Sequence, residues 1–402
     1  MSFSVKSRLL QVITCARSAA CLLLLSALSS CGGGDTTSAS LPGTGGTGIT
    51  ASGPISGFGS VVVNGIRFDD GAAQVQSDGA ASSSGALRLG MTAKVIGFQS
   101  STTAGSSPTT SSAGTANSME LWSVAQGSIK GVQLPNTVTV AGLTLVVDTG
   151  TVFEGAESLA SLKSDAVIKV WGQPSRADFT QWSVSRLEVL KAPQNTITTG
   201  KVSLRAGKWI LNTMVLTNAP DGLTEGQLIR VMGTLGGTTE ITLTAIQTTL
   251  LAEAGSTKPS TGYTDLQGIV SSILNTSTVA PNPVTRLTLG ASVVDTSSAN
   301  VLPLGASITE GMRLQVQGEW SAGVLVASQV KIISEQQQRE VEVEGTVESV
   351  IGISNFTVRG QRFDASAIAT EPQATLLIVG AQVKIAGVKK GNFVMVTRLE
   401  IN

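Results

Sequence analysis

The chain of 402 residues repeats one pattern five times, and this repeat constrains the fold more than any other feature. Each copy opens with a glycine two residues before an Ile or Val, and it later closes a strand with an apolar-x-Gly motif. The opening glycines are Gly53, Gly127, Gly200, Gly268 and Gly345. The closing glycines are Gly97, Gly172, Gly233, Gly318 and Gly387. Because the opening glycines lie about 70 residues apart throughout, we expect five copies of one structural unit.

Between these glycines, each copy has two short apolar segments separated by two residues that favour a tight turn. The pairs are Asn64-Gly65, Ala141-Gly142, Asn212-Thr213, Gly290-Ala291 and Arg359-Gly360. Two-residue hairpin turns need positive φ, which glycine and asparagine adopt most easily. A further strand follows the closing glycine, as at Thr397 to Ile401. About five short strands in about 70 residues predict a small, closed barrel of the OB type.

The predicted fold class is therefore all-β, with tandem small five-stranded OB-like barrels after a signal peptide and a flexible tether. The alternative is a single five-bladed propeller, with four strands per blade around a shared channel. A single propeller blade is unstable, whereas a closed barrel has no open sheet edge. The composition suits a β-rich protein, with 41% hydrophobic residues, 13% charged residues and 45 glycines that serve turns.

The repeat sets the expected domain boundaries. Residues 1–30 form a lipoprotein signal peptide, and residues 31–52, rich in Gly, Ser and Thr, form a flexible tether. We expect a linker at residues 254–267 and a polar connector, with room for one helical turn, at residues 335–344. The five barrel repeats are expected at residues 53–126, 127–199, 200–253, 268–334 and 345–402.

The N-terminal segment predicts export. Basic residues precede an apolar run that has signal-peptide length and is too short for a permanent membrane span. The run ends in Leu28-Ser29-Ser30-Cys31, which resembles the lipobox of bacterial lipoproteins. In that family the cysteine carries the lipid, so Cys31 is the expected lipidation site. Gly32 is not the Asp of an inner-membrane retention signal, so we expect the outer membrane. An ordinary secretory signal with a chance cysteine is the alternative.

The residue types exclude several chemistries. The chain has no histidine, which removes the commonest metal ligand, the commonest general base and every histidine-containing triad. The cysteines Cys15, Cys21 and Cys31 all lie within the predicted signal peptide or at its end, so we expect no disulfide or cysteine-based metal site beyond them. No cofactor is expected. The formal net charge is zero, without a basic tract, so nucleic acid is not an expected partner.

Copy one is similar to a known bacterial family. The segment from Gly57 to Gly65, GFGSVVVNG, and the segment from Leu89 to Gly97 resemble the family called domain of unknown function 5666. The resemblance is recognisable in copy five, around Phe356 to Gly360, and looser in copies two to four. It implies a small barrel on an exported, often lipid-anchored protein, and it supplies no catalytic residue.

Tryptophans are the candidate ligand-binding residues, because indole rings stack on sugars and bases and OB-type barrels bind oligomers on one face. The candidates are Trp122, Trp182, Trp209 and Trp320. The alternative is that these tryptophans pack barrel interiors or fill gaps between copies, and it is favoured because they do not recur at one position of the repeat.

Acidic and basic residues give weaker signals. Three aspartates, Asp69, Asp295 and Asp364, follow the return strand of the hairpin at one offset, which suits ion or sugar ligands but is more typical of Asx turns. No clustered Asp run is present, and a calcium site needs more ligands than these. Lys389-Lys390 is the main basic cluster and predicts a hairpin tip.

The predicted function is therefore non-enzymatic, a binding or scaffolding module of the cell envelope, anchored to the membrane through Cys31. A glycan or an envelope protein is the candidate partner. The alternatives are a mechanical spacer or envelope assembly component, and a histidine-free hydrolase that uses carboxylates.

Overall fold

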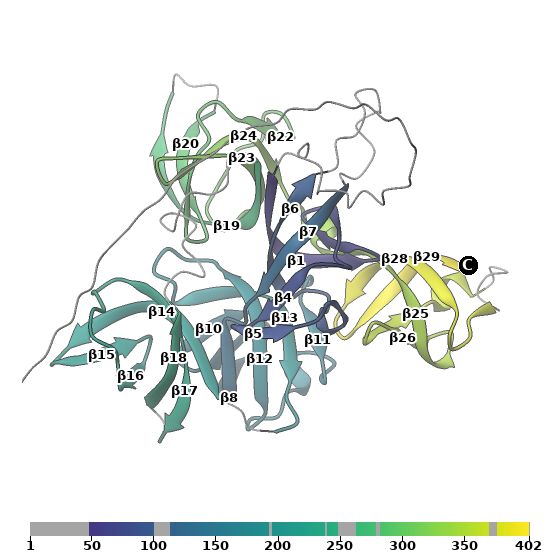
Figure 1. Ribbon diagram of the computed structural model, residues 1–402, viewed down its shortest axis with the longest axis horizontal. Coiled ribbons are helices and arrows are strands. Elements are labelled where there is room, and N and C mark those ends of the chain that lie inside the picture. The colour runs from purple at the N-terminus through teal and green to yellow at the C-terminus, as the bar shows by residue number, and fades with distance from the viewer. Residues whose placement is uncertain are drawn as a thin grey trace, which may run out of the picture. The chain divides into compact units, whose positions relative to one another are not determined.

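The computed structural model describes residues 48–99, 113–192, 195–237, 239–247, 263–278, 282–369 and 376–401. Strands dominate this part of the chain, which confirms the predicted all-β class (Figure 1). The residues from Gly45 onward form one unit. The predicted signal peptide, the lipidation site Cys31 and most of the predicted tether lie outside the described residues.

The described strands close into five barrels with one shared plan. In each barrel the first strand pairs with the second and the fourth, the second pairs with the third, and the fifth pairs with the third and the fourth. Only the pairing of the third strand with the fifth is parallel. Barrel 1 shows the complete ring, and barrels 2 to 5 repeat it. Closed rings confirm the predicted tandem five-stranded barrels and contradict the propeller alternative.

The strands that form the rings of the first three barrels are short. Barrel 1 consists of β1 (Gly48–Phe58), β2 (Val61–Val63), β3 (Ile66–Asp69), β6 (Thr92–Gln99) and β7 (Ala113–Leu121). Barrel 2 consists of β8 (Ala125–Gln133), β9 (Thr137–Val140), β10 (Leu143–Val146), β12 (Val167–Pro174) and β13 (Gln181–Val189). Barrel 3 consists of β14 (Thr196–Arg205), β15 (Lys208–Leu211), β16 (Met214–Thr217), β17 (Leu228–Gly236) and β18 (Glu240–Gln247).

The last two barrels follow the same plan. Barrel 4 consists of β19 (Tyr263–Thr276), β20 (Val284–Leu289), β21 (Ser292–Asp295), β23 (Arg313–Ser321) and β24 (Val324–Ile332). Barrel 5 consists of β25 (Glu340–Gly352), β26 (Asn355–Val358), β27 (Gln361–Asp364), β28 (Gln382–Lys390) and β29 (Phe393–Ile401). The remaining elements are β4 (Gln74–Ser77), β5 (Ala80–Ser82), β11 (Val152–Glu154), β22 (Asn300–Leu302), α1 (Glu335–Arg339), η1 (Ser84–Ala86), η2 (Leu159–Ser161) and η3 (Ser366–Ile368).

All five predicted turn pairs occupy two-residue loops between the second and third strands of their barrels. Both residues have positive φ in barrels 1, 2 and 5, as in a type I′ turn, whereas only the first has positive φ in barrels 3 and 4. Ala141 (φ 47°) and Arg359 (φ 49°) adopt this conformation although they carry a Cβ. The hairpin prediction is therefore confirmed in every copy.

The five closing glycines recur because each occupies a β-bulge between the fourth and fifth strands. A Cβ at Gly318 would lie 2.1 Å from the carbonyl oxygen of Val326, and the corresponding distance from Gly387 to the Met395 oxygen is 2.6 Å. Gly97, Gly172 and Gly233 face equally close carbonyl oxygens. A bulge bends the strand so that the sheet can close, and here only glycine fits beside the neighbouring backbone.

Two opening glycines are explained by the turn residue that faces them. In barrel 1, Nδ2 of Asn64 donates a hydrogen bond to the Ser52 carbonyl (3.0 Å), and a Cβ at Gly53 would lie 2.2 Å from Asn64 Oδ1. In barrel 3, Nδ2 of Asn212 donates to the Thr199 carbonyl (3.2 Å), next to Gly200. The glycine therefore makes room for an asparagine that ties the hairpin to the first strand.

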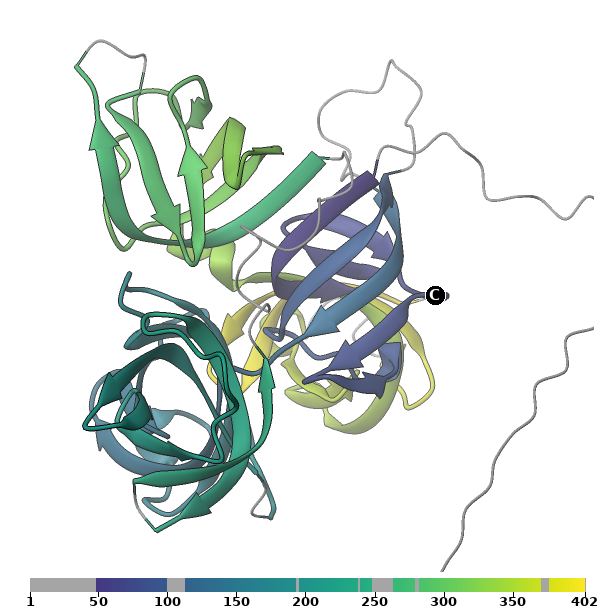
Figure 2. The same cartoon turned by 60° about the vertical axis from the view of Figure 1, so that its left-hand side comes forward.

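The barrels are joined by hydrogen-bonded ladders as well as by side chains. In Figure 2 the purple and blue strands of barrel 1 lie beside the yellow strands of barrel 5. Strand β1 pairs in parallel with β19 through Ile49 to Ser52, and it pairs in parallel with β25 through Gly57 and Phe58. Barrels 1, 4 and 5 thus share one continuous sheet, and barrels 2 and 3 share a second. The buried apolar residues of barrels 1 and 5 form one cluster, whereas those of barrels 2, 3 and 4 form separate clusters.

The first strands begin before the opening glycines of the repeat. Strand β8 starts at Ala125, two residues ahead of Gly127, and β14 starts at Thr196, ahead of Gly200. Strand β19 starts at Tyr263, so the end of the predicted linker at residues 254–267 is part of barrel 4. The predicted connector contains the one-turn helix α1 and the start of β25. The extra residues form the ladders between barrels, which the internal repeat does not encode.

Candidate functional site

A cavity of about 640 Å³ lies where barrels 1, 2, 4 and 5 meet. Barrel 1 contributes residues of β1 and its hairpin turn, and barrel 2 contributes the loop after β10 and part of β13. Barrel 4 contributes residues of β19, β23 and β24, and barrel 5 contributes residues of β25, β28 and β29. Helix α1 lines it as well. Amide and hydroxyl groups on the walls belong to Ser56, Asn64, Gln267, Gln315, Gln337 and Thr397. Pockets that bind small molecules have volumes of about 300 to 1,000 Å³.

Lys389 is a buried cation on the wall of this cavity, with 8% of its surface exposed. Within the described part of the chain, its ammonium makes no hydrogen bond and has no carboxylate within ion-pair distance. Burial is the main cause that lowers the pKa of Lys389 to about 8, and repulsion from Arg313 adds to it, while Asp148 opposes both.

The Lys389-Lys390 pair lies at a hairpin tip, since β28 ends at Lys390 and β29 begins at Phe393. The two lysines differ in exposure, because successive side chains of a strand point to opposite faces. Lys390 is exposed, whereas Lys389 turns inward to the cavity. A surface basic cluster is therefore the wrong description of this pair.

Arg313 is a second, largely buried cation on the cavity wall, with 9% of its side chain exposed, and it joins barrel 4 to barrel 2. Its NH1 group donates to Gln173 Oε1 (2.7 Å), and its NH2 group donates to Ser183 Oγ (3.2 Å). Asp148 Oδ2 lies 4.0 Å away, and this aspartate is half-exposed. Burial lowers the pKa of Arg313, and Asp148 acts in the opposite direction. The guanidinium therefore has neutral partners and only a distant carboxylate.

Asp265 is a fully buried carboxylate at the junction of barrels 1 and 4. It accepts hydrogen bonds from Nδ2 of Asn64 (2.9 Å) and from Nε2 of Gln315 and Gln317 (both 2.8 Å). None of the described lysines and arginines lies within ion-pair distance. Burial raises the pKa of Asp265 to about 6, and the three amide hydrogen bonds oppose the shift. Two of the amides, Asn64 and Gln315, also line the cavity.

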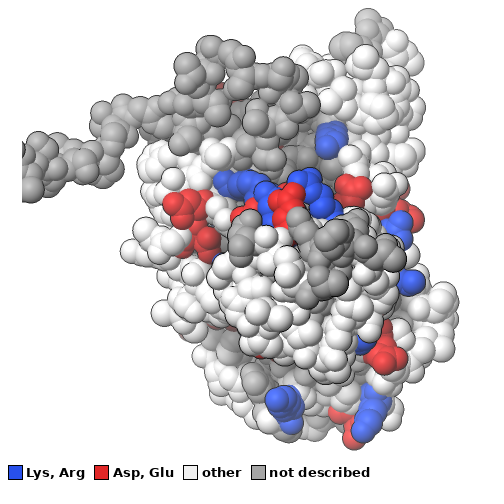
Figure 3. All heavy atoms as spheres, turned by 90° about the vertical axis from the view of Figure 1, so that its right-hand side faces the viewer, with Lys and Arg blue, Asp and Glu red and all other residues white. Residues whose placement is uncertain are grey.

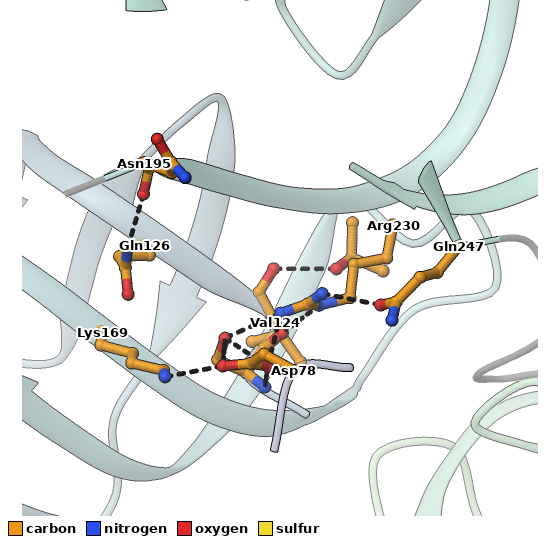
Figure 4. Close-up of polar contacts among 9 residues, drawn as sticks. Asp78, Val124, Gln126, Lys169, Asn195, Arg230 and Gln247 are labelled. Atoms are coloured by element: carbon orange, nitrogen blue, oxygen red, sulfur yellow. Dashed lines mark hydrogen bonds and ion pairs between the residues drawn. The ribbon is translucent and has the colours of Figure 1, made fainter. Parts of the chain in front are cut away.

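A second polar cluster, centred on Asp78, joins barrels 1, 2 and 3. Figure 4 shows Asp78 between Lys169 of barrel 2, at 2.6 Å, and Arg230 of barrel 3, at 2.5 Å. Asp78 belongs to the β4–β5 turn and also accepts from the Ser123 amide (2.8 Å). Arg230, which is 3% exposed, donates further to Gln247 Oε1 (2.7 Å). With each cation paired, this cluster is a structural junction.

Surface charge is sparse and mixed. On the face in Figure 3, basic and acidic side chains lie together in small groups that are separated by uncharged surface. Arg67 of barrel 1 pairs with Glu342 of barrel 5, and within barrel 5 Lys384 contacts Glu344 at 2.8 Å. These ion pairs neutralise charge locally, in contrast to the unpaired Lys389.

Residues 126–180 match the family model described as "Domain of unknown function (DUF5666)". The match begins in β8 and ends just before β13, so it covers most of barrel 2. The DUF5666 match confirms the predicted resemblance, and it falls in copy two, whereas the residues quoted for the resemblance stand in copies one and five. A search of the curated proteins finds no match to the chain.

The predicted tryptophans do not come together at one site. Trp182 lies inside barrel 2, where its Nε1 donates to the Phe179 carbonyl (3.0 Å), and Trp122 is buried beside the same barrel core. Trp209 and Trp320 are half-buried and pack against the cores of barrels 3 and 4. The placement agrees with the packing alternative, and none of the four lines the large cavity.

The three repeated aspartates form Asx turns. In each case the carboxylate accepts the backbone N–H two residues later, at Gly71 (3.1 Å), Ser297 (3.0 Å) and Ser366 (2.9 Å). Hydrogen bonds from Ser297 and Ser366 lower the pKa of Asp295 and of Asp364. The described residues contain no group of three or more His, Cys, Asp or Glu placed to hold a metal ion. No helix in the described ranges has the length and apolarity to span a membrane.

Sequence reasoning missed four residues that form the cavity and its junctions, Asp78, Asp265, Arg230 and Arg313, and it named Lys389 only as part of a hairpin tip. One signal was available for one of them. Arg230 stands in the mostly apolar strand from Leu228 to Gly236, where an unpaired charge is costly. A charged residue at such a position indicates either a partner from another copy or a ligand.

Proposed function

We propose that this protein is a non-enzymatic binding module of the bacterial cell envelope, and that its ligand occupies the cavity between barrels 1, 2, 4 and 5. The observation that carries the proposal is the cavity itself, at about 640 Å³ and lined by four copies of the repeat. Its volume suits a small molecule, and its walls combine apolar side chains with convergent amides and hydroxyls. Binding sites commonly form where domains meet.

The buried cations of the cavity support a binding role over a purely structural one. A buried charge without a partner costs free energy, so a wall that serves only packing would favour an apolar residue at position 389. Elsewhere in the described chain, buried inter-barrel charges have close partners: Asp78 is paired with Lys169 and Arg230, and Asp265 accepts three amide hydrogen bonds. Lys389, on the wall of the large cavity, has no such partner among the described residues.

We further propose that a lipid on Cys31 holds the barrels at the outer membrane. The support is the Leu28 to Cys31 segment, its apolar run and the Gly-, Ser- and Thr-rich residues that follow. Radiolabelled palmitate should enter the wild-type protein and not Cys31→Ala. Equal labelling of the two proteins would contradict the lipid anchor and would leave the cavity proposal untouched.

The binding role is tested with the full chain and a panel of sugars, amino acids, nucleotides and sugar phosphates, by thermal shift followed by calorimetry. We expect at least one compound class to bind saturably. Thr397→Trp places a bulky ring at an exposed position on the cavity wall and should weaken that binding at least tenfold. Arg398→Trp, at the adjacent exposed position outside the cavity lining, is the matched control and should keep wild-type affinity.

A rigid spacer is the second candidate, favoured by the ladders that join β1 to β19 and β25 and by the Asp78 cluster. Such contacts suit a protein that holds two envelope components at a fixed distance. The same panel separates the two roles, because a spacer binds none of the compounds saturably. Binding that Thr397→Trp leaves unchanged would also contradict the cavity proposal.

A further inference from the structure

Two cations share the inner wall of the cavity and are not neutralised there. Lys389 has no carboxylate within ion-pair distance among the described residues, and Arg313 has only Asp148, at 4.0 Å. Asp148 is itself held by an Asx turn, in which its Oδ1 accepts the Gly150 amide (2.8 Å). One solvent-exposed carboxylate therefore faces the buried Lys389 and the largely buried Arg313, and this part of the wall carries an excess of positive charge.

The other charged residues around the cavity do not remove this excess at Lys389. Glu342 is paired with Arg67 and lies 3.7 Å from Lys384. Glu340 is exposed and accepts a hydrogen bond from Gln336 Nε2 (3.2 Å). Lys331 is exposed and adds a third cation to the lining. The acids on the lining are thus either paired elsewhere or in contact with solvent.

We infer that the cavity binds a small organic anion through a phosphate, sulfate or carboxylate group placed at Lys389 and Arg313. The inference rests on the proposed binding function and names the chemical class of the ligand. An oxyanion would give Lys389 the charged partner that it lacks, and hydrogen bonds between ionised groups are about twice as strong as neutral ones. The ligand is organic because the cavity is far larger than one such group, and its amide and hydroxyl walls suit a polar, hydroxylated body.

Proton linkage gives the site a further property. Burial and Arg313 lower the pKa of Lys389 to about 8, so the unliganded side chain loses its charge above that pH. A bound anion favours the protonated ammonium and raises this pKa, so binding above pH 8 takes up a proton. Arg313, Asp148, Lys331, Glu340 and Glu342 are the other charged groups around the cavity.

The test is calorimetric titration of the full chain with three probes: sodium sulfate, glucose 6-phosphate and glucose. Sulfate keeps its charge across the pH range, so it isolates the titration of the protein. We expect sulfate and glucose 6-phosphate to bind saturably at pH 6.5, the sugar phosphate more tightly, and glucose to bind at least tenfold more weakly than glucose 6-phosphate. The affinity for sulfate should fall about tenfold between pH 6.5 and pH 9.5.

Two lysine variants decide where the anion binds. Lys389→Met should lower the affinity for both anions at least tenfold and remove the pH dependence, while its Tm stays equal or rises because a buried charge is removed. An unchanged or higher Tm shows that the variant has lost the anion site and has not misfolded. Lys390→Met, at the exposed neighbouring position, is the matched control and should bind like the wild type.

The outcomes separate this inference from the proposed function. Wild-type affinity in Lys389→Met, or glucose binding as tightly as its phosphate, would overturn the anion inference. Sulfate binding without glucose 6-phosphate binding would contradict the inference that the ligand is an organic anion. If neither anion binds but a neutral compound from the panel does, and Thr397→Trp blocks it, the anion inference fails and the binding function stands.

Discussion

Barrels 3 and 5 share a strand plan but differ in how they join the rest of the protein. Barrel 3 has a buried apolar cluster of its own, and it meets barrel 2 through a single ladder pair, Ile197 with Gln126. Barrel 5 has no separate core, because its buried residues are continuous with those of barrel 1. Strand β25 also extends the sheet of β1 at Gly57 and Phe58.

The comparison shows that barrels built from the same repeated sequence pattern differ in how strongly each is joined to its neighbours. The glycine bulge and the two-residue hairpin close each barrel, and they recur in both barrels. What differs is the ladder made by the first strand, since β25 pairs with β1 at two positions whereas β14 pairs with β8 at one. The ladders between barrels therefore set how independently each barrel unfolds. Barrel 3, with one ladder pair, is held to its neighbours more by side-chain contacts such as those of Arg230.

The largest expected effect comes from a substitution that breaks the side-chain junction between Asp78 of barrel 1 and Arg230 of barrel 3. Asp78→Ala should lower the free energy of unfolding by about 3–5 kcal/mol, because it leaves the buried Arg230 without its carboxylate. Glu400→Ala, which breaks the exposed pair with Arg398, is the control and should cost at most about 1 kcal/mol. Urea denaturation measures both. Equal losses would mean that barrel 3 does not depend on Asp78.

The next effect compares equivalent bulges. Gly233→Ala in barrel 3 and Gly387→Ala in barrel 5 each bring a methyl group against a backbone carbonyl and should cost about 1–3 kcal/mol. Hydrogen exchange should increase in barrel 3 alone for the first variant and in barrels 5 and 1 together for the second. Gly131→Ala, where a Cβ meets nothing within 4 Å, is the control. Exchange confined to barrel 5 in Gly387→Ala would contradict the shared core.

A third effect extends the comparison to the junction of barrels 1 and 4. Because the pKa of Asp265 is raised to about 6 in the folded state, folding takes up a proton between about pH 4 and pH 6. The contribution of this group to stability is thus complete below its unfolded pKa and is lost as the pH rises through 6. Relative to Asp265→Asn, the wild type should gain about 1–2 kcal/mol between pH 7 and pH 4.5 in urea denaturation. A constant difference would disprove the raised pKa.

The smallest effects concern the hairpin turns. Asn212→Ala in barrel 3 should cost about 1 kcal/mol, because it removes hydrogen bonds to Thr198 Oγ1 (3.0 Å) and to the Thr199 carbonyl. Arg359→Ala in barrel 5 should cost about 0.5–1 kcal/mol, since the guanidinium stacks over the Phe58 ring of barrel 1 at 5.2 Å. The first loss should be local to barrel 3, and the second should weaken the coupling of barrels 1 and 5. Thermal unfolding followed barrel by barrel through hydrogen exchange distinguishes them.

The sequence predicts what is local and repeated. Asn64-Gly65 and its counterparts predict the hairpins because turn geometry depends on two residues, and the closing glycines recur because each barrel needs the same bulge. The cavity depends on contacts across long sequence separations, such as Asn64 with Asp265 and Gln173 with Arg313. Lys389 looked like a surface residue because strand alternation does not say which face meets another barrel. Nothing in one copy encodes the partner that another copy provides.

Native-state hydrogen exchange of the full chain in rising urea, followed by mass spectrometry, tests the fused-barrel arrangement most directly. The shared core predicts that the amides of β1 and of β25 to β29 merge into one opening reaction with a single free energy, while those of β14 to β18 open separately at a lower one. If barrel 5 opens independently of barrel 1, with its own free energy, the five copies are separate beads and the cavity between them is not a built site.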